Sequence, residues 1–445
     1  MKKKQLRWTL WTIASPFILF IILCILIYLP PIQNFLVDKA AVYASEATGM
    51  NISVGRISLS FPLNLVVTDV DAASPHKDTL LSVRRLQVNV QLLPLLKKQV
   101  EVDGISLQGA TVNSNDLIHG MRLNGTLGEL FISSHGVALD PETAIVNKVL
   151  LKDTDLSLCL NDTAAADTAA SDTTYWKIIL QDIDLQNVSF ALDMPLDSLS
   201  LAASLDNAIL RDGLIDLHKS AYSLQTFRIK NGRVRYDSGR PSATASADSL
   251  SAGLDPSHIA LTDIGVKLDS LYYEGRNMKA IISQFVLKER SGVEIVSTEG
   301  RLVSNDKVLR VPSLKLETRD SYLELNAAMD WDALDFKKEG LVSARLMADI
   351  GKPDVVRFMG SMDEKFIRKY PSEPLRIRTG IDGDLNKLKL TTLTAELPGA
   401  LELFAKGELT SLTDSLLRGG DITLQAETKD LKFISTLAEG IEIPY

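Results

Sequence analysis

The sequence Val100-x-Val102-x-x-Ile105-x-Leu107 contains an interrupted alternation that decides the expected fold. Apolar residues alternate with other residues on both sides of a two-residue gap. In a regular β-strand successive side chains point to opposite faces, so this gap would move the second apolar pair to the other face. One extra residue, bulged out of the strand, restores the shared face. The phrase therefore predicts a bent strand that keeps one apolar face.

The same phrase recurs along the chain, which extends this prediction to many strands. The other copies are Ile52-x-Val54-x-x-Ile57-x-Leu59, Val149-x-Leu151-x-x-Thr154-x-Leu156, Ile178-x-Leu180-x-x-Ile183-x-Leu185, Phe227-x-Ile229-x-x-Gly232-x-Val234 and Ile259-x-Leu261-x-x-Ile264-x-Val266. In five copies the second gap residue is of a type that tolerates the backbone of a bulge or tight bend: Gly104, Asp153, Asp182, Asn231 and Asp263. Bulges at matching places would coil an antiparallel sheet into a trough.

The overall composition is that of a folded protein with no sign of a nucleic-acid partner. The chain has 445 residues, of which 45% are hydrophobic and 23% charged, and its formal net charge is −8. This is enough apolar material for a large core or several units. No basic stripe follows the N-terminus, which argues against nucleic-acid binding. The two cysteines, Cys24 and Cys159, predict no disulfide framework.

The N-terminus has the pattern of an uncleaved membrane anchor. Lys2, Lys3, Lys4 and Arg7 precede an uncharged run from Trp8 to Leu29, which is long enough to cross a hydrocarbon layer of ~30 Å. The residues expected to hold this anchor in the membrane are Trp8, Trp11, Phe17, Phe20, Tyr28 and Leu29. A cleaved signal peptide is the competing interpretation, but no small-x-small cleavage site follows the run. The positive start predicts a cytoplasmic N-terminus, with everything after Pro31 outside.

We expect five segments. Residues 1–31 are the basic start and anchor, and residues 32–49 form an amphipathic helix that covers a sheet edge or lies on the membrane surface. Residues 50–350 form the strands, interrupted at 161–174 by a solvated low-complexity loop with Asp-Thr-Ala triplets that could accept O-linked sugars. Residues 351–371 form a helical insertion. Strands resume over 372–445, and the chain is expected to continue in a longer parent protein.

The sequence offers no catalytic or metal chemistry. The five histidines, His76, His119, His135, His218 and His258, are isolated, and no phosphate-binding, dinucleotide-binding or nucleophile-elbow motif occurs. Acidic residues such as Asp153, Asp155, Asp182 and Asp184 recur in the strand gaps, where turn and bulge chemistry accounts for them better than glycosidase chemistry does. We predict that the protein is not an enzyme and has no catalytic residues, no metal site and no cofactor.

The apolar positions of so many strands define one long apolar surface. Either the sheet packs on itself as a closed sandwich, or it forms an open groove whose inside suits acyl chains. For the groove, the residues expected to line it are Val100, Val102, Ile105, Leu107, Ile178, Leu180, Ile183, Leu185, Ile259, Leu261, Ile264 and Val266.

Several stretches resemble a known family of envelope proteins. They are the charged start, the single anchor, a helix ending in Thr48-Gly49-Met50, the first strand pair, and the run Gln91-Leu92-Leu93-Pro94-Leu95-Leu96-Lys97-Lys98-Gln99-Val100-Glu101-Val102. Together they resemble the N-terminal portion of the AsmA-like family and its TamB branch, the inner-membrane subunit of the translocation and assembly module. The segment from Leu314 to Trp331, with its Leu-x-Leu-Glu-Thr and Leu-Glu-Leu-Asn phrases, is similar to the repeated strands of that family. The C-terminal domain that characterises full-length TamB proteins is not recognisable in this chain.

The resemblance implies a mainly β protein. Its inner-membrane anchor would be followed by an elongated, curved antiparallel β-groove, the β-taco, with a few short helices, in the periplasm of a bacterium. It implies a role in outer-membrane biogenesis and in carrying phospholipid between membranes, with an outer-membrane β-barrel assembly protein as a partner. A second hypothesis is an assembly or secretion factor that binds barrel or autotransporter strands at its sheet edge. A third, an anchored surface hydrolase, would require a carboxylate pair in a cleft.

Overall fold

The computed structural model gives the positions of residues across most of the chain after the N-terminal segment. The residues that it describes are 39, 41–42, 45–46, 49–60, 64–74, 79–91, 102–114, 120–138, 142–161, 175–239, 253–334, 338, 340–359, 364–384, 386–412 and 418–430. Of these residues, 76% lie in β-strands, so the expectation of a mainly β fold with few helices is confirmed.

The chain divides into two compact units, which are described separately. Unit 1 comprises Met1–Ser171 and Asp184–Asp193, and unit 2 comprises Asp172–Ile183 and Met194–Tyr445. The strands of unit 1 are β1 (Asn51–Ser60), β2 (Asn64–Ala73), β3 (Thr79–Val90), β4 (Val102–Asn113), β5 (Met121–Ala138) and β6 (Thr143–Leu160). Strand β7 (Lys177–Met194) contributes its first part to unit 2 and residues 184–193 to unit 1.

Unit 2 holds most of the strands. They are β8 (Leu199–Asp216), β9 (Ala221–Leu224), β10 (Thr226–Ser238), β11 (His258–Glu274), β12 (Asn277–Glu289), β13 (Glu294–Ser304), β14 (Val308–Thr318), β15 (Tyr322–Asp330), β16 (Val342–Ile350), β17 (Leu375–Gly383), β18 (Lys387–Leu397), β19 (Leu401–Thr410) and β20 (Gly419–Thr428).

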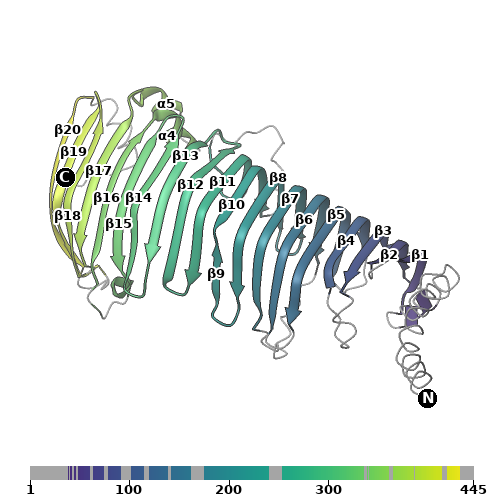
Figure 1. Ribbon diagram of the computed structural model, residues 1–445. Coiled ribbons are helices and arrows are strands. Elements are labelled where there is room, and N and C mark those ends of the chain that lie inside the picture. The colour runs from purple at the N-terminus through teal and green to yellow at the C-terminus, as the bar shows by residue number, and fades with distance from the viewer. Residues whose placement is uncertain are drawn as a thin grey trace, which may run out of the picture. The chain divides into compact units, whose positions relative to one another are not determined.

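Each unit is built by antiparallel pairing of strands that follow one another in the sequence. In unit 1 each strand from β1 to β6 pairs with the next (Figure 1). In unit 2, β8 pairs with both β9 and β10, these two pair with β11, and consecutive pairing continues to β20. Within each unit, the described strands make extensive contacts only with their hydrogen-bonded neighbours. Each unit is therefore a single layer rather than a two-sheet sandwich.

Short helices lie at the strand ends of unit 2. The 3-10 helix η1 (Trp331–Leu334) follows β15, while α4 (Lys352–Met359) and α5 (Glu364–Lys369) connect β16 to β17 at the opposite strand ends (Figure 1). The only buried apolar cluster found among the described residues is at this helical connection. Tyr370, Leu397 and Ala400 form it, and Val355 of α4 packs against it together with Leu375 and Leu401.

Little of the N-terminal segment is described. Residues 39, 41–42 and 45–46 are helical, and Gly49, with a φ of 69°, donates its backbone N–H to the Ser45 carbonyl at 2.9 Å. The expected anchor residues and the topology charges at 2, 3, 4 and 7 lie outside the described residues. None of the helices in the described part of the chain has the length and apolar character of a membrane span.

Candidate functional site

One face of the unit 1 sheet carries aligned rows of apolar side chains. The strand register places Ile57, Val67, Leu86, Leu107, Leu130 and Leu151 opposite one another in one row, and Leu59, Leu65, Val88, Ile105, Ile132 and Val149 in the next. On the far side of a two-residue gap, a third row contains Val54, Val70, Val83, Ala110, Leu127 and Thr154, and a fourth contains Ile52, Ala72, Leu81, Val112, Gly125 and Leu156. No charged residue interrupts these rows.

Left-handed residues in the gap keep the four rows on one face. Asp69, Gly109 and Asp153 have φ values of 54°, 62° and 51°, in β2, β4 and β6 respectively. The neighbouring strands supply Gly55, Arg84 and Gly128 at the facing positions. A Cβ added to Gly128 would lie 2.8 Å from the Asp153 Cβ, which is closer than side chains tolerate. Because the bends lie opposite one another, each strand changes the face to which its alternate side chains point at the same place along the sheet.

The other face of unit 1 is polar. The register aligns Arg56, Thr68, Arg85, Gln108, Glu129 and Lys152 in one row, and Ser53, Asp71, Ser82, Thr111, Thr126 and Asp155 in another. An antiparallel sheet with one solvated face shows this alternation. The apolar face is therefore a property of the whole unit and not of a single strand.

Unit 2 carries an equivalent apolar face. Between β8 and β11 its rows include Ala203, Val234 and Leu261, then Ala208, Ile229 and Val266, then Leu210, Phe227 and Leu268. From β14 to β20 two central rows are Leu314, Leu325, Leu346, Thr379, Leu393, Ala405 and Leu424, and Leu316, Leu323, Ala348, Ile377, Ala395, Leu403 and Ala426. None of these positions is charged.

These faces are not sealed inside a core. The buried apolar residues in the described part of the chain are mostly alanines, and the larger ones are Leu80, Val83, Val293, Tyr370 and Leu397. Ile105 is 37% exposed, and Leu107 and the row residues Leu261 and Val266 of β11 are only partly buried. A soluble protein rarely leaves so large an apolar surface without a partner. The two apolar faces are therefore the candidate site.

The predicted lining residues fall into three strands. Ile105 and Leu107 lie in β4 of unit 1, on its apolar face, and Val102 lies in the same strand opposite Val90. Ile259, Leu261, Ile264 and Val266 lie on the apolar face of unit 2, opposite Tyr236, Val234, Gly232 and Ile229 of β10. Ile178, Leu180 and Ile183 lie in the part of β7 that belongs to unit 2, and Leu185 lies in the part that belongs to unit 1. Val100 lies outside the described residues.

The bulge positions taken from the sequence behave in two ways. Asp153, Asn231 and Asp263 have left-handed φ values of 51°, 54° and 53°. Gly104 and Asp182 are not left-handed. Beside Gly104, the pairing of β3 with β4 instead shifts register between Asn89 and Val90. Asp182 instead forms an ion pair with Arg211.

The candidate site extends beyond the predicted residues. The rows of β14 to β20 include Leu314, Leu325 and Leu346, which the predicted set does not contain. Leu325 and Leu346 lie in strands with regular alternation, whereas Leu314 follows a register shift after Val311. In β15 and β16 the signal is plain alternation of apolar residues. In β14 and β18 it is the interrupted phrase itself, as Leu309-x-Val311-x-x-Leu314-x-Leu316 and Leu388-x-Leu390-x-x-Leu393-x-Ala395.

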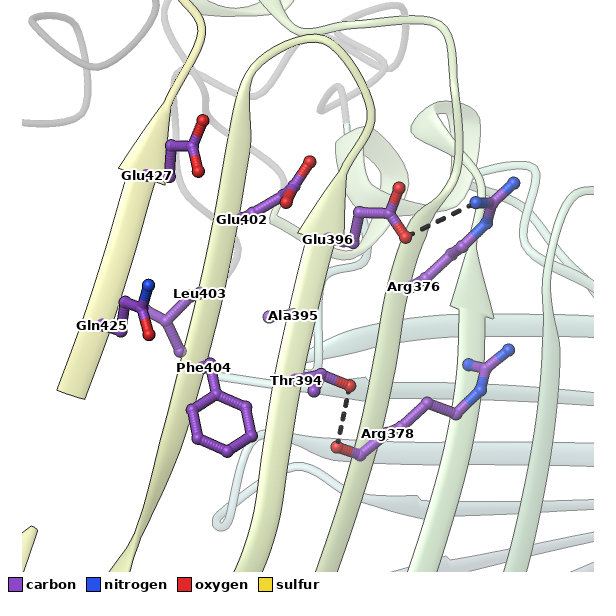
Figure 2. Close-up of a pocket in the computed structure, with 10 residues that line it drawn as sticks. All are labelled: Arg376, Arg378, Thr394, Ala395, Glu396, Glu402, Leu403, Phe404, Gln425 and Glu427. Carbon is purple, nitrogen blue, oxygen red and sulfur yellow. Dashed lines mark hydrogen bonds and ion pairs between the residues drawn. The ribbon is translucent and has the colours of Figure 1, made fainter. Parts of the chain in front are cut away.

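The polar face of unit 2 holds a cavity of about 580 Å³ over β17 to β20 (Figure 2). Two cross-strand rows line it. One row contains Arg376, Glu396, Glu402 and Glu427, and the other contains Arg378, Thr394, Phe404 and Gln425. Ala395 and Leu403 complete the lining.

Ion pairs organise the charges around this cavity. Arg376 pairs with Glu396 at 3.5 Å, Arg378 pairs with Asp349 at 2.8 Å, and Lys429 pairs with Glu402. The Glu402 hydrogen bond, with added attraction from Glu427 and Glu396, raises the pKa of Lys429. The charged side chains around the cavity therefore form a ladder of ion pairs between neighbouring strands.

Metal ligation has little support in this geometry. No group of three or more His, Cys, Asp or Glu side chains in the described ranges is placed to hold a metal ion. Of the histidines, His258 contacts Asp255 at 2.9 Å, and His218 packs edge-on against Tyr175. Comparison with protein-family models and with curated proteins finds no match.

Proposed function

We propose that this chain is an inner-membrane-anchored, periplasmic β-groove protein that carries phospholipid between membranes for outer-membrane biogenesis. The observation that supports this most is the run of uncharged, partly exposed apolar rows across consecutive strands of each unit. Single-pass insertion with a cytoplasmic N-terminus, a curved groove and phospholipid as cargo all belong to the proposal. The chain needs no catalytic residue or cofactor in this role.

The energetics of the apolar rows suit an acyl chain that moves. Each methylene removed from water contributes roughly 0.8 kcal/mol, so contact with several row residues offsets much of the cost of leaving a bilayer. The rows offer similar apolar contacts at each strand step, and they present no charged group that would hold a lipid at one position. Contacts of this kind favour sliding along the rows over tight binding at a single site.

A pair of matched variants tests this proposal. Leu261→Asp places a carboxylate on the apolar face of unit 2, whereas Thr262→Asp places the same charge on the adjacent, exposed position of the polar face. An uncompensated charge beside an acyl chain costs several kcal/mol. We expect Leu261→Asp to lose phospholipid that co-purifies with the wild-type chain, as measured by extraction and mass spectrometry, and Thr262→Asp to retain it. Equal lipid in both folded variants would overturn the proposal.

Strand addition at a sheet edge is the second candidate function. All ten residues of β20 are exposed, including Leu424 at 62%, and β19 is the partner strand that the described pairings give it. An exposed strand can template pairing with another chain. Crosslinks from β20 backbone positions to nascent outer-membrane proteins, with none from the apolar rows to lipid, would favour this function.

The hydrolase hypothesis is weakened by the polar-face cavity. Glu396 and Glu402 lie opposite each other, but their side chains are 44% and 48% exposed and each pairs with a cation. That arrangement is typical of ion-pair ladders across neighbouring strands.

A further inference from the structure

The two ends of the unit 2 strands differ in chemistry. We call the strand ends beside α4 and α5 the helix end, and the opposite ends, where the turns 274–277 and 304–308 and η1 lie, the aromatic end (Figure 1). The outermost row of the apolar face at the aromatic end contains Tyr222, Tyr273, Met278, Ser304, Leu309, Met329 and Val342. This row begins with two tyrosines, whereas the inner rows are mostly aliphatic.

The tyrosines are half exposed and lie together. Tyr222 and Tyr273 are 40% and 42% exposed, and their ring centroids are 6.1 Å apart. One step inward, the same strands place Leu224 opposite Leu271. The phenol rings thus continue the apolar face to the point where it meets solvent.

Trp331 and Arg276 extend this border along the same row. The indole Nε1–H donates to the Ser304 hydroxyl at 3.1 Å and to the Asn305 carbonyl at 2.8 Å, and Ser304 belongs to the row. The Arg276 guanidinium lies 5.6 Å from the centre of the Trp331 ring. We call Tyr222, Tyr273, Trp331 and Arg276 the aromatic rim.

At the helix end the register places a single described tyrosine of β8 to β11, Tyr236, on the apolar face, opposite Leu201 and Ile259. There Arg319 pairs with Glu294, Lys288 pairs with Asp263, and Arg357 pairs with Asp354 and Asp320. The α4 helix also packs its Val355 onto the apolar residues of β17 to β19. These three cations of the helix end are matched by carboxylates, as Lys338 is by Asp332 at the aromatic end, whereas Arg276 lies over an aromatic ring.

Amphipathic rings and a cation at the edge of an apolar surface fit a lipid border. Tyr and Trp side chains prefer the level where a bilayer changes from hydrocarbon to polar headgroups. Arginine binds phosphate oxygens through a planar set of donors. We infer that the aromatic rim holds the phosphodiester headgroups of phospholipids whose acyl chains lie on the apolar rows of unit 2. This inference rests on the proposed lipid-carrying function, and it adds that the headgroups lie at the aromatic end of the unit 2 strands.

Fluorescence quenching by spin-labelled phospholipid tests the rim separately from the function. In one full-length variant Trp331 is the sole tryptophan, with Trp8, Trp11 and Trp176 changed to Phe. In the other, Leu325→Trp in a central row is the sole tryptophan, with Trp331 also changed to Phe. Each is incubated with phosphatidylethanolamine vesicles that contain a phospholipid labelled on the headgroup or near the acyl terminus, and then re-purified. We expect the headgroup label to quench Trp331 several-fold more than the acyl label, with the reverse order at Leu325→Trp.

The outcomes separate the two proposals. No quenching at Leu325→Trp by either label would overturn the proposed function. Quenching there by the acyl label, with no preference for the headgroup label at Trp331, would leave the function standing and overturn the rim. Arg276→Gln should weaken the lipid affinity measured at Leu325→Trp by about tenfold, the loss of one charge-assisted hydrogen bond. Arg319→Gln at the helix end should not change it, and equal effects of the two variants would overturn the phosphate contact.

Discussion

At the residue scale, the apolar faces depend on single left-handed residues inside strands. Asp153 has a φ of 51°, and its Oδ1 accepts a hydrogen bond from the Asn187 amide at 2.9 Å. An acidic or amide side chain tolerates this backbone, whereas a β-branched side chain does not. The bend therefore constrains residue type at Asp153 and at Gly128, which faces it on the neighbouring strand.

Substitution of Asp153 separates backbone strain from side-chain contacts. Asp153→Val should be less stable than Asp153→Gly by about 1–2 kcal/mol, because both variants lose the Asn187 contact but only valine is strained at positive φ. The measurement is the urea midpoint of unfolding. Lys152→Val, at the exposed neighbouring position, is the control and should change the midpoint little. Equal midpoints for the glycine and valine variants would contradict the assigned role of the bend.

A second residue-scale prediction concerns acid stability. The Arg345 guanidinium, followed by the Ser343 hydroxyl, holds the pKa of Asp382 below its usual range. A lowered folded-state pKa gives a contribution that is present above the unfolded-state value of about 3.9 and is lost as pH falls through the folded-state value. Asp382→Asn should therefore lower the unfolding free energy at neutral pH and have no effect at strongly acidic pH.

The size of that effect is set by exposure. The side chains of Arg345 and Asp382 are 53% and 39% exposed, so the coupling should be about 0.5 kcal/mol at most. A double-mutant cycle with Arg345→Gln at both pH values measures it. A coupling that persists at the acidic pH would contradict the assignment to the ionised carboxylate.

At the element scale, α4 is fixed to the sheet by a buried carboxylate. Asp354 is 1% exposed, and it accepts hydrogen bonds from the Thr318 hydroxyl, the Ser321 hydroxyl at 2.6 Å and the Arg357 guanidinium at 3.1 Å. Thr318 and Ser321 belong to the turn between β14 and β15. The carboxylate thus joins the helix to two strands that precede it.

Loss of this carboxylate should release α4 and spare the strands. Asp354→Ala leaves two hydroxyls and Arg357 without their shared acceptor, at a cost of about 2–4 kcal/mol. Hydrogen exchange should become faster in 352–359 and remain slow in β14 and β15. Asp320→Asn should have a smaller effect, because the Asp320 side chain is 31% exposed. Unchanged protection of α4 in Asp354→Ala would show that Val355 packing alone holds the helix.

The strands themselves were largely predictable, and their alignment was not. Interrupted phrases around Leu107, Leu151 and Leu261 indicated apolar faces because alternation is a property of local sequence. The spacing of apolar residues does not distinguish a strand that bends at a left-handed residue, as at Asp153, from one that shifts register against its neighbour, as beside Gly104. The polar-face cavity and the aromatic rim depend on the register of several strands, which no single stretch of sequence contains.

At the scale of the whole molecule, the proposed anchor decides where the apolar faces work. If residues 1–31 alone hold the chain in the membrane, a chain in which a cleavable export signal replaces them should appear in the soluble periplasmic fraction. Wild-type chain should resist carbonate extraction in the same experiment. Retention of the shortened chain in the membrane fraction would contradict a sole anchor and point to the surface-lying alternative for residues 32–49.

The proposal also requires lipid to contact the apolar face of each unit. Leu107→Asp charges the face of unit 1 and Leu261→Asp that of unit 2, while Gln108→Asp and Thr262→Asp place the same charge on the polar faces. A carboxylate costs several kcal/mol beside hydrocarbon and so outweighs a handful of methylenes at roughly 0.8 kcal/mol each. In a strain that lacks the protein, each apolar-face variant should fail to restore the outer-membrane barrier, and the double variant should be no worse than either. Full restoration of the barrier by either apolar-face variant would mean that the face of that unit is not needed, and the proposal for that unit would have to be abandoned.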